Sequence, residues 1–224
     1  KDVDNIFNVD ILFYNRGIYM IKRIIFDIDG TLLDTNRDFI KTYSEFAKNV
    51  NLNVSAKDIY DIIDKYDKLD KKISKNDFLN LINERLNINL SLDDFNNFFN
   101  IYSHTATLLN DNTANILKDL SNNYEIVALS NWYVDQQKER LKTCDILKYF
   151  SEVYGYENAG MKPKKETFDV ACDGLDYSEV LMIGDSIRVD IEIPSKLGMK
   201  VIYFNPSKED SEYDIISSLD ELID

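Results

Sequence analysis

Four short apolar segments, each ending at a polar residue, constrain the fold of this chain more than any other feature. They run from Ile21 to Phe26, Ile126 to Leu129, Val180 to Ile183 and Val201 to Phe204, and Asp27, Ser130, Gly184-Asp185 and Asn205 follow them. Their brevity and β-branched content favour buried parallel strands over helices. Because helical patterns separate them, the sequence predicts an α/β fold with a parallel sheet.

Helices are expected between these strands and after the last one. Asp111 is expected to cap a helix running toward Leu120, and further helices are expected from Tyr133 to Leu141, from Lys164 to Cys172 and from Ile215 to Ile223. A helix that begins near Asp190 tolerates Pro194 in its first turn, whereas one that begins at Ser186 would need a kink.

The stretch from about residue 36 to residue 108 has a different pattern, with no convincing strand and with apolar residues at helical spacing. Its stripes are Phe39, Tyr43 and Phe46; Ile59, Ile62, Ile63 and Tyr66; Phe78, Leu81 and Ile82; and Phe95, Phe98 and Phe99. We therefore expect an N-terminal extension at 1–20, a core formed by 21–35 and 109–224, and a helical insert at 36–108. Met20 is a candidate for the biological start.

The polar residues at the first strand end carry the candidate chemistry, because ligands of open α/β sheets bind outside the carboxyl ends of the strands. Side chains alternate along an extended strand, so Asp27 and Asp29 face the same way while Ile28 turns into the protein. Gly30 permits a tight departure from the strand, and Thr31 offers a hydroxyl and an N–H nearby. Two carboxylates are thus expected to converge.

Asp185, and Asp190 five residues later, bring the expected acidic count at this edge to four. Four carboxylates in one cleft repel one another unless a cation lies among them. Oxygen ligands without Cys or His nearby select Mg²⁺, which a substrate phosphate oxygen can complete. The expected donors to the other phosphate oxygens are Thr31, Ser130, Asn131 and Lys162. The pattern therefore predicts phosphoryl transfer.

Each of these residues can be given a role in hydrolysing a phosphate ester. Asp27 is the predicted nucleophile, which forms an aspartyl-phosphate. Asp29 is predicted to protonate the leaving alkoxide and later to take a proton from water. Lys162 offsets charge at the transferring group, and Asp185 holds the metal together with the first two carboxylates. Asp190 is expected to contact the residues that hold the metal and the substrate, and not the metal or the substrate itself.

Four motifs, in this order, resemble those of the haloacid dehalogenase-like (HAD) superfamily. They are Asp27-Ile28-Asp29-Gly30-Thr31-Leu32-Leu33-Asp34-Thr35, Ser130-Asn131, Lys162-Pro163, and Gly184-Asp185-Ser186 with Asp190. The resemblance implies a Rossmann-like core, a Mg²⁺ cofactor and a small all-α cap, which agrees with the helical insert. It also implies phosphatase or phosphomutase chemistry, because dehalogenases and phosphonatases of this superfamily lack the carboxylate at the position of Asp29.

Three functions fit this pattern. The leading one is a phosphatase acting on a small phosphorylated metabolite, with sugar phosphates, phosphoglycolate, nucleoside monophosphates and pyrophosphate all open as substrates. The second is a sugar phosphomutase, which would need a basic site for a second phosphate; Lys41, Lys65, Lys68 and Arg85 are its candidates. The third is a non-catalytic binding or regulatory protein, disfavoured because no catalytic position is lost.

The formal net charge of −14 argues against nucleic acid and anionic membranes as partners. No apolar run approaches the ~20 residues that span a bilayer. Cys144 and Cys172 have neither disulfide nor metal-ligand spacing, so we expect a cytoplasmic enzyme. Trp132 is expected to line the entrance to the site or to pack under the cap. His104, the one histidine, is expected on the surface or at a hinge.

Overall fold

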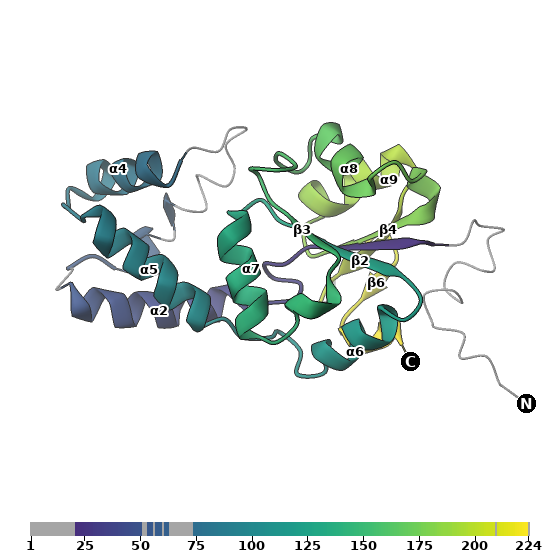
Figure 1. Cartoon of the computed structure of the whole chain (residues 1–224), viewed down its shortest axis with the longest axis horizontal. Helices are drawn as coiled ribbons and strands as arrows, with labels where there is room; N and C mark the ends of the chain where they lie inside the picture. Colours follow the sequence, from purple (N-terminus) through teal and green to yellow (C-terminus); the bar gives the residue numbers. More distant parts are fainter. Residues whose placement is uncertain are drawn as a thin grey trace, which may run out of the picture.

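The structure, a computed structural model, describes residues 21–50, 53–55, 57–59, 61–62, 74–208 and 210–223. A parallel six-stranded sheet in the order β3-β2-β1-β4-β5-β6 lies at the centre of the core (Figure 1). Its strands are β1 (Arg23–Phe26), β2 (Glu125–Leu129), β3 (Glu152–Tyr154), β4 (Val180–Gly184), β5 (Lys200–Phe204) and β6 (Ile215–Ile216). The prediction of an α/β fold with a parallel sheet is confirmed, and all four expected strands are present.

Helices cover both faces of this sheet. On one face α6 (Thr113–Leu120) and α7 (Val134–Thr143) pack, and on the other α8 (Lys165–Cys172) and α9 (Glu192–Leu197). Alternation along β1 divides its side chains accordingly: Ile24 and Phe26 belong to the apolar cluster with α6, and Ile25 to the cluster with α8. Burial on both faces explains why the central strands are apolar throughout.

The helical insert contains α2 (Thr35–Asn49), α4 (Lys75–Leu86) and α5 (Leu92–His104), which lie beyond α7 from the sheet (Figure 1). Its buried side chains form a separate apolar cluster that includes the expected stripes of Phe39, Tyr43 and Phe46 and of Phe95, Phe98 and Phe99. The expected positions Ile63 and Tyr66, and the extension at 1–20, lie outside the described residues. The domain limits at 36 and 108 stay a prediction.

Two chain segments connect the helical insert to the core, and they run side by side. Leu33 and Leu108 form an antiparallel bridge. Asp34 N–H donates to the Thr107 carbonyl at 3.0 Å, and Leu109 N–H donates to the Leu32 carbonyl at 3.0 Å. The two crossings, residues 33–38 and 105–109, are therefore hydrogen-bonded to each other.

The predicted helix from Ile215 to Ile223 is wrong. Ile215 and Ile216 pair with Tyr203 and Phe204 as strand β6, and a single 3₁₀ turn, η4 (Leu219–Leu222), follows. The apolar residues are spaced as on a helix, but Ser218 caps the new turn and so separates it from the strand. Tertiary pairing outweighed the local pattern here.

Two other helix starts differ in detail from expectation. The first residue of α6 is Thr113, and Asn112 rather than Asp111 takes the N-cap position, with no side-chain cap bond. After β4, a π-helical turn, η3 (Ile187–Ile191), leads directly into α9, so Pro194 lies in the first turn of α9, where a proline is tolerated. Short 3₁₀ turns, η1 (Leu147–Tyr149) and η2 (Tyr177–Glu179), precede β3 and β4.

Within the described part of the chain, no helix combines the length and apolar character that crossing a bilayer requires.

Candidate active site

A cavity of about 670 Å³ lies where the strand ends meet the helical insert, and most of the predicted site residues line it. Asp27 follows β1 directly, Ser130 follows β2 and Asp185 follows β4. The Asp27 N–H donates to the Ile183 carbonyl at 2.9 Å, which extends the strand pairing to the predicted nucleophile. The Asp27 side chain is thereby held at the cavity wall, and the residue is 6% exposed.

Two glycines make the close approach of the acidic side chains possible. Gly30 has φ of +90°, and a Cβ there would lie 2.4 Å from Asp185 Oδ2. A Cβ at Gly184 would lie 2.5 Å from the Cβ of Asp190. Any larger residue at either position would push an acidic side chain out of the cluster.

Lys162 is the buried cation of the site. Its Nζ donates to Asp27 Oδ1 and to Asp190 Oδ1, both at 2.6 Å. Burial by itself would lower the pKa of Lys162, but Asp190 and Asp27 outweigh it and hold the pKa above its ordinary value. Lys162 is therefore a fixed positive charge beside Asp27.

Asn131, Thr31 and Ser130 were predicted to donate to phosphate, and the structure gives each a partner in the protein. The Asn131 amide accepts from the Lys162 N–H at 2.7 Å and donates to the Lys162 carbonyl at 3.1 Å. Thr31 Oγ1 donates to Asp27 Oδ2 at 3.2 Å. Ser130 Oγ lies 3.3 Å from Asp29 Oδ2 and accepts from the Trp132 N–H at 3.1 Å. Asn131 thus orients Lys162, and donation to phosphate stays a prediction for all three.

Asp29 is held by residues that the sequence interpretation did not include. Arg140 Nη1 and Gln137 Nε2, both on α7, donate to its two carboxylate oxygens at 2.5 Å each. Thr35 Oγ1, in the first turn of α2, donates at 2.8 Å. Burial would raise the pKa of Asp29, but Arg140, together with these hydrogen bonds, holds it below its ordinary value.

The carboxylates of Asp27, Asp185 and Asp190 each place an oxygen within 4.8 Å of the other two. Burial, and then repulsion from Asp190 and Asp185, raises the pKa of Asp27 well above its ordinary value in spite of Lys162. Loss of water around Asp185, followed by repulsion from Asp190, raises the pKa of Asp185 to about 6. The single charge of Lys162 does not balance these three carboxylates, and their all-oxygen donor set fits a hard cation such as Mg²⁺.

This group differs in one member from the predicted metal ligands Asp27, Asp29 and Asp185. The Asp29 carboxylate turns toward Arg140, and Asp190 takes its place in the cluster. Asp190 itself accepts from Lys162 and, through Oδ2, from the Ser186 N–H at 3.1 Å. Asp27, Asp185 and Asp190 are therefore the described carboxylates that lie close enough together to share an ion, and the roles of metal ligand and supporting residue stay predictions.

The helical insert contributes aromatic side chains to the lining of the cavity, and β5 contributes Tyr203 and Phe204. Phe39, Phe98 and Tyr102 line the cavity together with Trp132, which follows Ser130-Asn131. Trp132 is 9% exposed and packs edge-on against Phe78, so it both packs under the insert and borders the cavity. His104 is exposed, as predicted, with Nδ1 2.7 Å from the Asn100 carbonyl oxygen.

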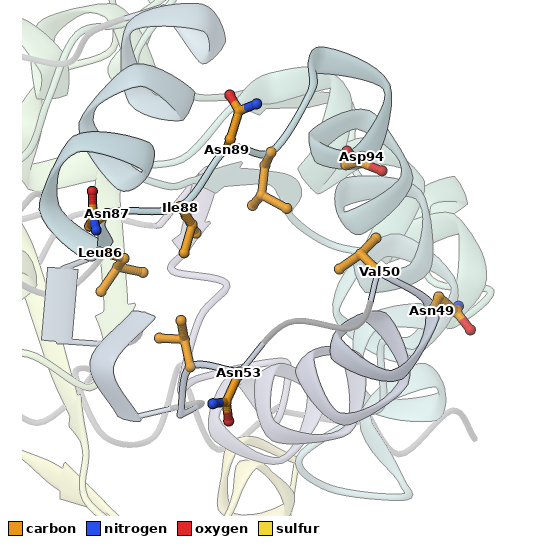
Figure 2. Close-up of a pocket in the computed structure, with 10 residues that line it drawn as sticks. Asn49, Val50, Asn53, Leu86, Asn87, Ile88, Asn89 and Asp94 are labelled. Atoms are coloured by element: carbon orange, nitrogen blue, oxygen red, sulfur yellow. The ribbon is translucent and has the colours of Figure 1, made fainter.

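A second hollow, of about 600 Å³, lies within the helical insert, and Figure 2 shows Val50 across it from Leu86 and Ile88. Its lining also includes several asparagines and Asp94. Asp94 accepts from the backbone and hydroxyl of Ser91 as the cap of α5, at 2.9 and 2.7 Å. The described lining therefore presents no cluster of reactive groups comparable to that around Asp27.

Residues 24–204 match the family model of the haloacid dehalogenase-like hydrolases. The chain belongs to this family, and the family prediction is confirmed.

Among curated relatives, pyrimidine 5′-nucleotidase PynA of Streptococcus pneumoniae is 28% identical over 202 residues, which cover 83% of this chain and 84% of that protein. Pyrophosphatase PpaX of Oceanobacillus iheyensis is 27% identical over 175 residues, covering 74% and 75%. N-acylneuraminate-9-phosphatase of Mus musculus is 24% identical over 213 residues, covering 85% of each.

Solved structures share the fold across nearly the whole chain. The HAD-hydrolase YfnB of Bacillus subtilis, bound to magnesium, has a TM-score of 0.73 at 18% identity and covers 91% of this chain and 97% of its own. A 2-haloacid dehalogenase of Pseudomonas syringae has a TM-score of 0.70 at 19% identity, covering 91% and 96%. Because a dehalogenase shares the fold, the reaction has to be argued from the side chains of the site.

Proposed function

We propose that this hydrolase is a Mg²⁺-dependent phosphatase that cleaves a small-molecule phosphate monoester through an aspartyl-phosphate on Asp27. The observation that carries the proposal is the pair of carboxylates at one strand end. Asp27 lies against Lys162 at 2.6 Å, and Asp29 borders the same cavity as a second carboxylate. A nucleophile and a separate proton carrier are what hydrolysis of a phosphate ester requires.

In the first step, a carboxylate oxygen of Asp27 attacks phosphorus, and the bond from phosphorus to the ester oxygen breaks. The leaving oxygen takes a proton from Asp29. Arg140 favours the ionised form of Asp29, but the negative charge of an arriving phosphate favours the protonated form. Lys162 stays charged throughout and offsets the charge that builds on the phosphoryl oxygens.

In the second step, water attacks the phosphorus of the aspartyl-phosphate and gives its proton to Asp29. The bond between phosphorus and the Asp27 oxygen breaks, inorganic phosphate leaves, and the Asp27 carboxylate is restored. The ionised Asp29, held by Arg140 and Gln137, suits this step. Asn131 keeps Lys162 in place through both steps.

Asp27 and Asp185 would hold the Mg²⁺, which when bound neutralises the acidic cluster and the phosphate oxygens. The close grouping of these carboxylates supports this, because burial and then mutual repulsion raise the pKa of both carboxyl groups, and a bound cation would offset that repulsion. Asp190 would act indirectly by fixing Lys162 and the turn at Ser186.

The relatives support removal of phosphate but not one substrate. The names of these relatives refer to pyrimidine nucleotides, pyrophosphate and N-acylneuraminate 9-phosphate. We propose that residues 36–108 form the cap that selects the substrate, because three of the six aromatic residues that line the cavity, Phe39, Phe98 and Tyr102, come from α2 and α5. The cavity of about 670 Å³ suits a small metabolite.

The phosphomutase alternative requires a basic site for a second phosphate. Of its four candidates, Lys65 and Lys68 lie outside the described residues. Lys41 and Arg85 are exposed, and neither is among the described residues that line the cavity. No described contact therefore favours a mutase over a phosphatase.

The test is release of inorganic phosphate from a panel of phosphate esters in the presence of Mg²⁺. The panel holds nucleoside monophosphates, sugar phosphates, phosphoglycolate and pyrophosphate. We expect at least one to be hydrolysed, and we expect Asp27→Asn or a chelator to abolish release. Asp119→Asn, on helix α6 of the sheet-containing core domain, is the matched control and should retain full activity.

Other results would lead to different conclusions. Isomerisation of a sugar phosphate without release would establish a mutase. Binding of phosphate esters with no turnover by the wild-type protein would leave a non-catalytic protein. Full activity of Asp27→Asn would refute the assigned nucleophile.

A further inference from the structure

Arg140 lies beneath the candidate active site, and the mechanism above assigns it no direct part in bond breaking. It is on α7 and is 0% exposed, which makes it the largest fully buried side chain in the described part of the molecule. A buried ion pair seldom adds net stability over well-packed apolar residues, because removing both charges from water is costly. Stability therefore does not explain why an arginine is buried at position 140.

The guanidinium group fixes the Asp29 carboxylate on the core side. Nη1 donates to Asp29 Oδ1 at 2.5 Å and to Gln137 Oε1 at 3.0 Å. Gln137 in turn donates to Asp29 Oδ2 at 2.5 Å and to Ser130 Oγ at 2.8 Å. With both oxygens bound from α7, the Asp29 carboxylate has little rotational freedom.

The same guanidinium group also contacts the outgoing crossing directly and is linked to the returning crossing through Asp38. Nη2 lies 3.5 Å from Asp38 Oδ2 and 3.5 Å from Thr35 Oγ1, both in α2. Asp38 accepts from the Thr107 hydroxyl at 2.7 Å and from its N–H at 3.0 Å, which joins the outgoing crossing to the returning one. On its other side, Arg140 stacks 4.3 Å from the ring centre of Tyr102 in α5.

We propose that Arg140 is a positioning residue that aims the Asp29 carboxylate at the ester oxygen, and that this aim depends on where the helical insert lies. The inference rests on the proposed phosphatase function. Arg140 contacts Asp29, α2 and α5 at the same time. A shift of either crossing would move the guanidinium group, and the carboxylate with it.

The test compares two substrates of nearly the same shape, phenyl phosphate and 4-nitrophenyl phosphate. The nitro group stabilises the leaving phenolate, so its departure needs little help from a proton donor, whereas phenolate needs more. A misplaced Asp29 therefore slows phenyl phosphate more. The readout is the ratio of kcat/KM for phenyl phosphate to kcat/KM for 4-nitrophenyl phosphate, measured on one preparation so that any loss of folded protein cancels.

Arg140→Lys is the main variant, because it retains the positive charge but loses the planar fork that holds the carboxylate. We expect the ratio to fall about tenfold, which is a partial loss of the roughly 100- to 10,000-fold that general acid catalysis contributes. Gln137→Leu removes the second contact to Asp29 without changing charge, and it should lower the ratio in the same direction. It provides the test if Arg140→Lys does not fold. Glu139→Gln, an exposed change on α7, should leave the ratio unchanged.

Asp38→Asn tests the dependence on the helical insert, because it removes the charge facing Arg140 while an amide oxygen can still accept from Thr107. We expect a smaller fall in the same ratio. Unchanged ratios in both Arg140→Lys and Gln137→Leu would overturn the proposal and leave Arg140 a structural residue. An effect in those two variants without one in Asp38→Asn would overturn the link to the insert. A wild-type protein that releases phosphate from no ester at all would instead refute the proposed function.

Discussion

Gly184→Ala tests whether the fine spacing of the acidic cluster determines activity. The new Cβ would lie 2.5 Å from both Cβ and Cγ of Asp190, whereas ordinary contacts begin at 3.4 Å. The Asp190 side chain would have to move by roughly 1 Å. Because Asp190 accepts from Lys162 at 2.6 Å, moving Asp190 would also move Lys162, which lies beside Asp27.

The magnitude follows from two separate costs. Crowding a packed interior typically lowers the free energy of unfolding by about 1–3 kcal/mol. A misplacement of about 1 Å at the reacting groups lowers the rate about 100-fold, which corresponds to about 2.7 kcal/mol of activation free energy. We expect both effects in Gly184→Ala.

Gly174→Ala separates the two effects. Gly174 has φ of +83°, but nothing lies within 4 Å of an added Cβ. The left-handed conformation costs an alanine roughly 1–2 kcal/mol. This control should thus lose comparable stability in urea unfolding and keep its kcat, measured at saturating Mg²⁺ on the best substrate of the panel. If Gly184→Ala keeps wild-type kcat, or if both variants lose activity in proportion to stability, the spacing argument fails.

Four further changes probe the helical insert, the thiols, the C-terminal turn and the cation. Phe98→Ala should lower the free energy of unfolding in urea by about 3–5 kcal/mol, because the ring is buried among four aromatic neighbours; a loss below 1 kcal/mol would contradict this. Burial raises the pKa of Cys144 and of Cys172 to about 11. Iodoacetamide at pH 8 should therefore label the folded protein far more slowly than the urea-unfolded chain. Equal labelling rates would be inconsistent with the burial of the two thiols. Hydrogen bonds from a serine and two asparagines lower the pKa of Asp220 to about 2, below the unfolded value of about 3.9. The stabilising contribution of Asp220 is therefore complete above about pH 4 and is lost toward pH 2. In Asp220→Asn, the Tm should fall less steeply between pH 4 and pH 2 than in the wild type. The same slope in both proteins would disprove this contribution. Mg²⁺ should raise the Tm of the wild type and raise that of Asp185→Asn much less; equal shifts would argue against Asp185 as a ligand.

The sequence was sufficient for the elements whose burial leaves a local pattern. β1, β2, β4 and β5 lie inside the sheet and are apolar for that reason. β3 and β6 are short edge strands of three and two residues, and they exist because a neighbouring strand offers hydrogen bonds. Such pairing has no local signature, which is why Ile215 to Ile223 looked helical.

The candidate site divides in a similar way. Asp27, Ser130 and Asp185 could be placed together from sequence, because parallel strands end at one edge. Arg140 and Gln137 could not, because polar residues on a helix are by default assigned to its solvated face. The available signal was their spacing of three residues on the same helix as the buried Leu141. Which face of α7 is covered depends on how it packs against the crossings, and that is decided in three dimensions.

The paired crossings at Leu33 and Leu108 have a consequence for protein engineering. Since hydrogen bonds hold the two ends of the insert together, the core closes this junction whatever lies between them. Closing a longer or shorter loop over ends already in contact changes the entropic cost only slowly with length. The junction is thus a natural grafting point, where a foreign recognition module could be exchanged without altering the register of the sheet.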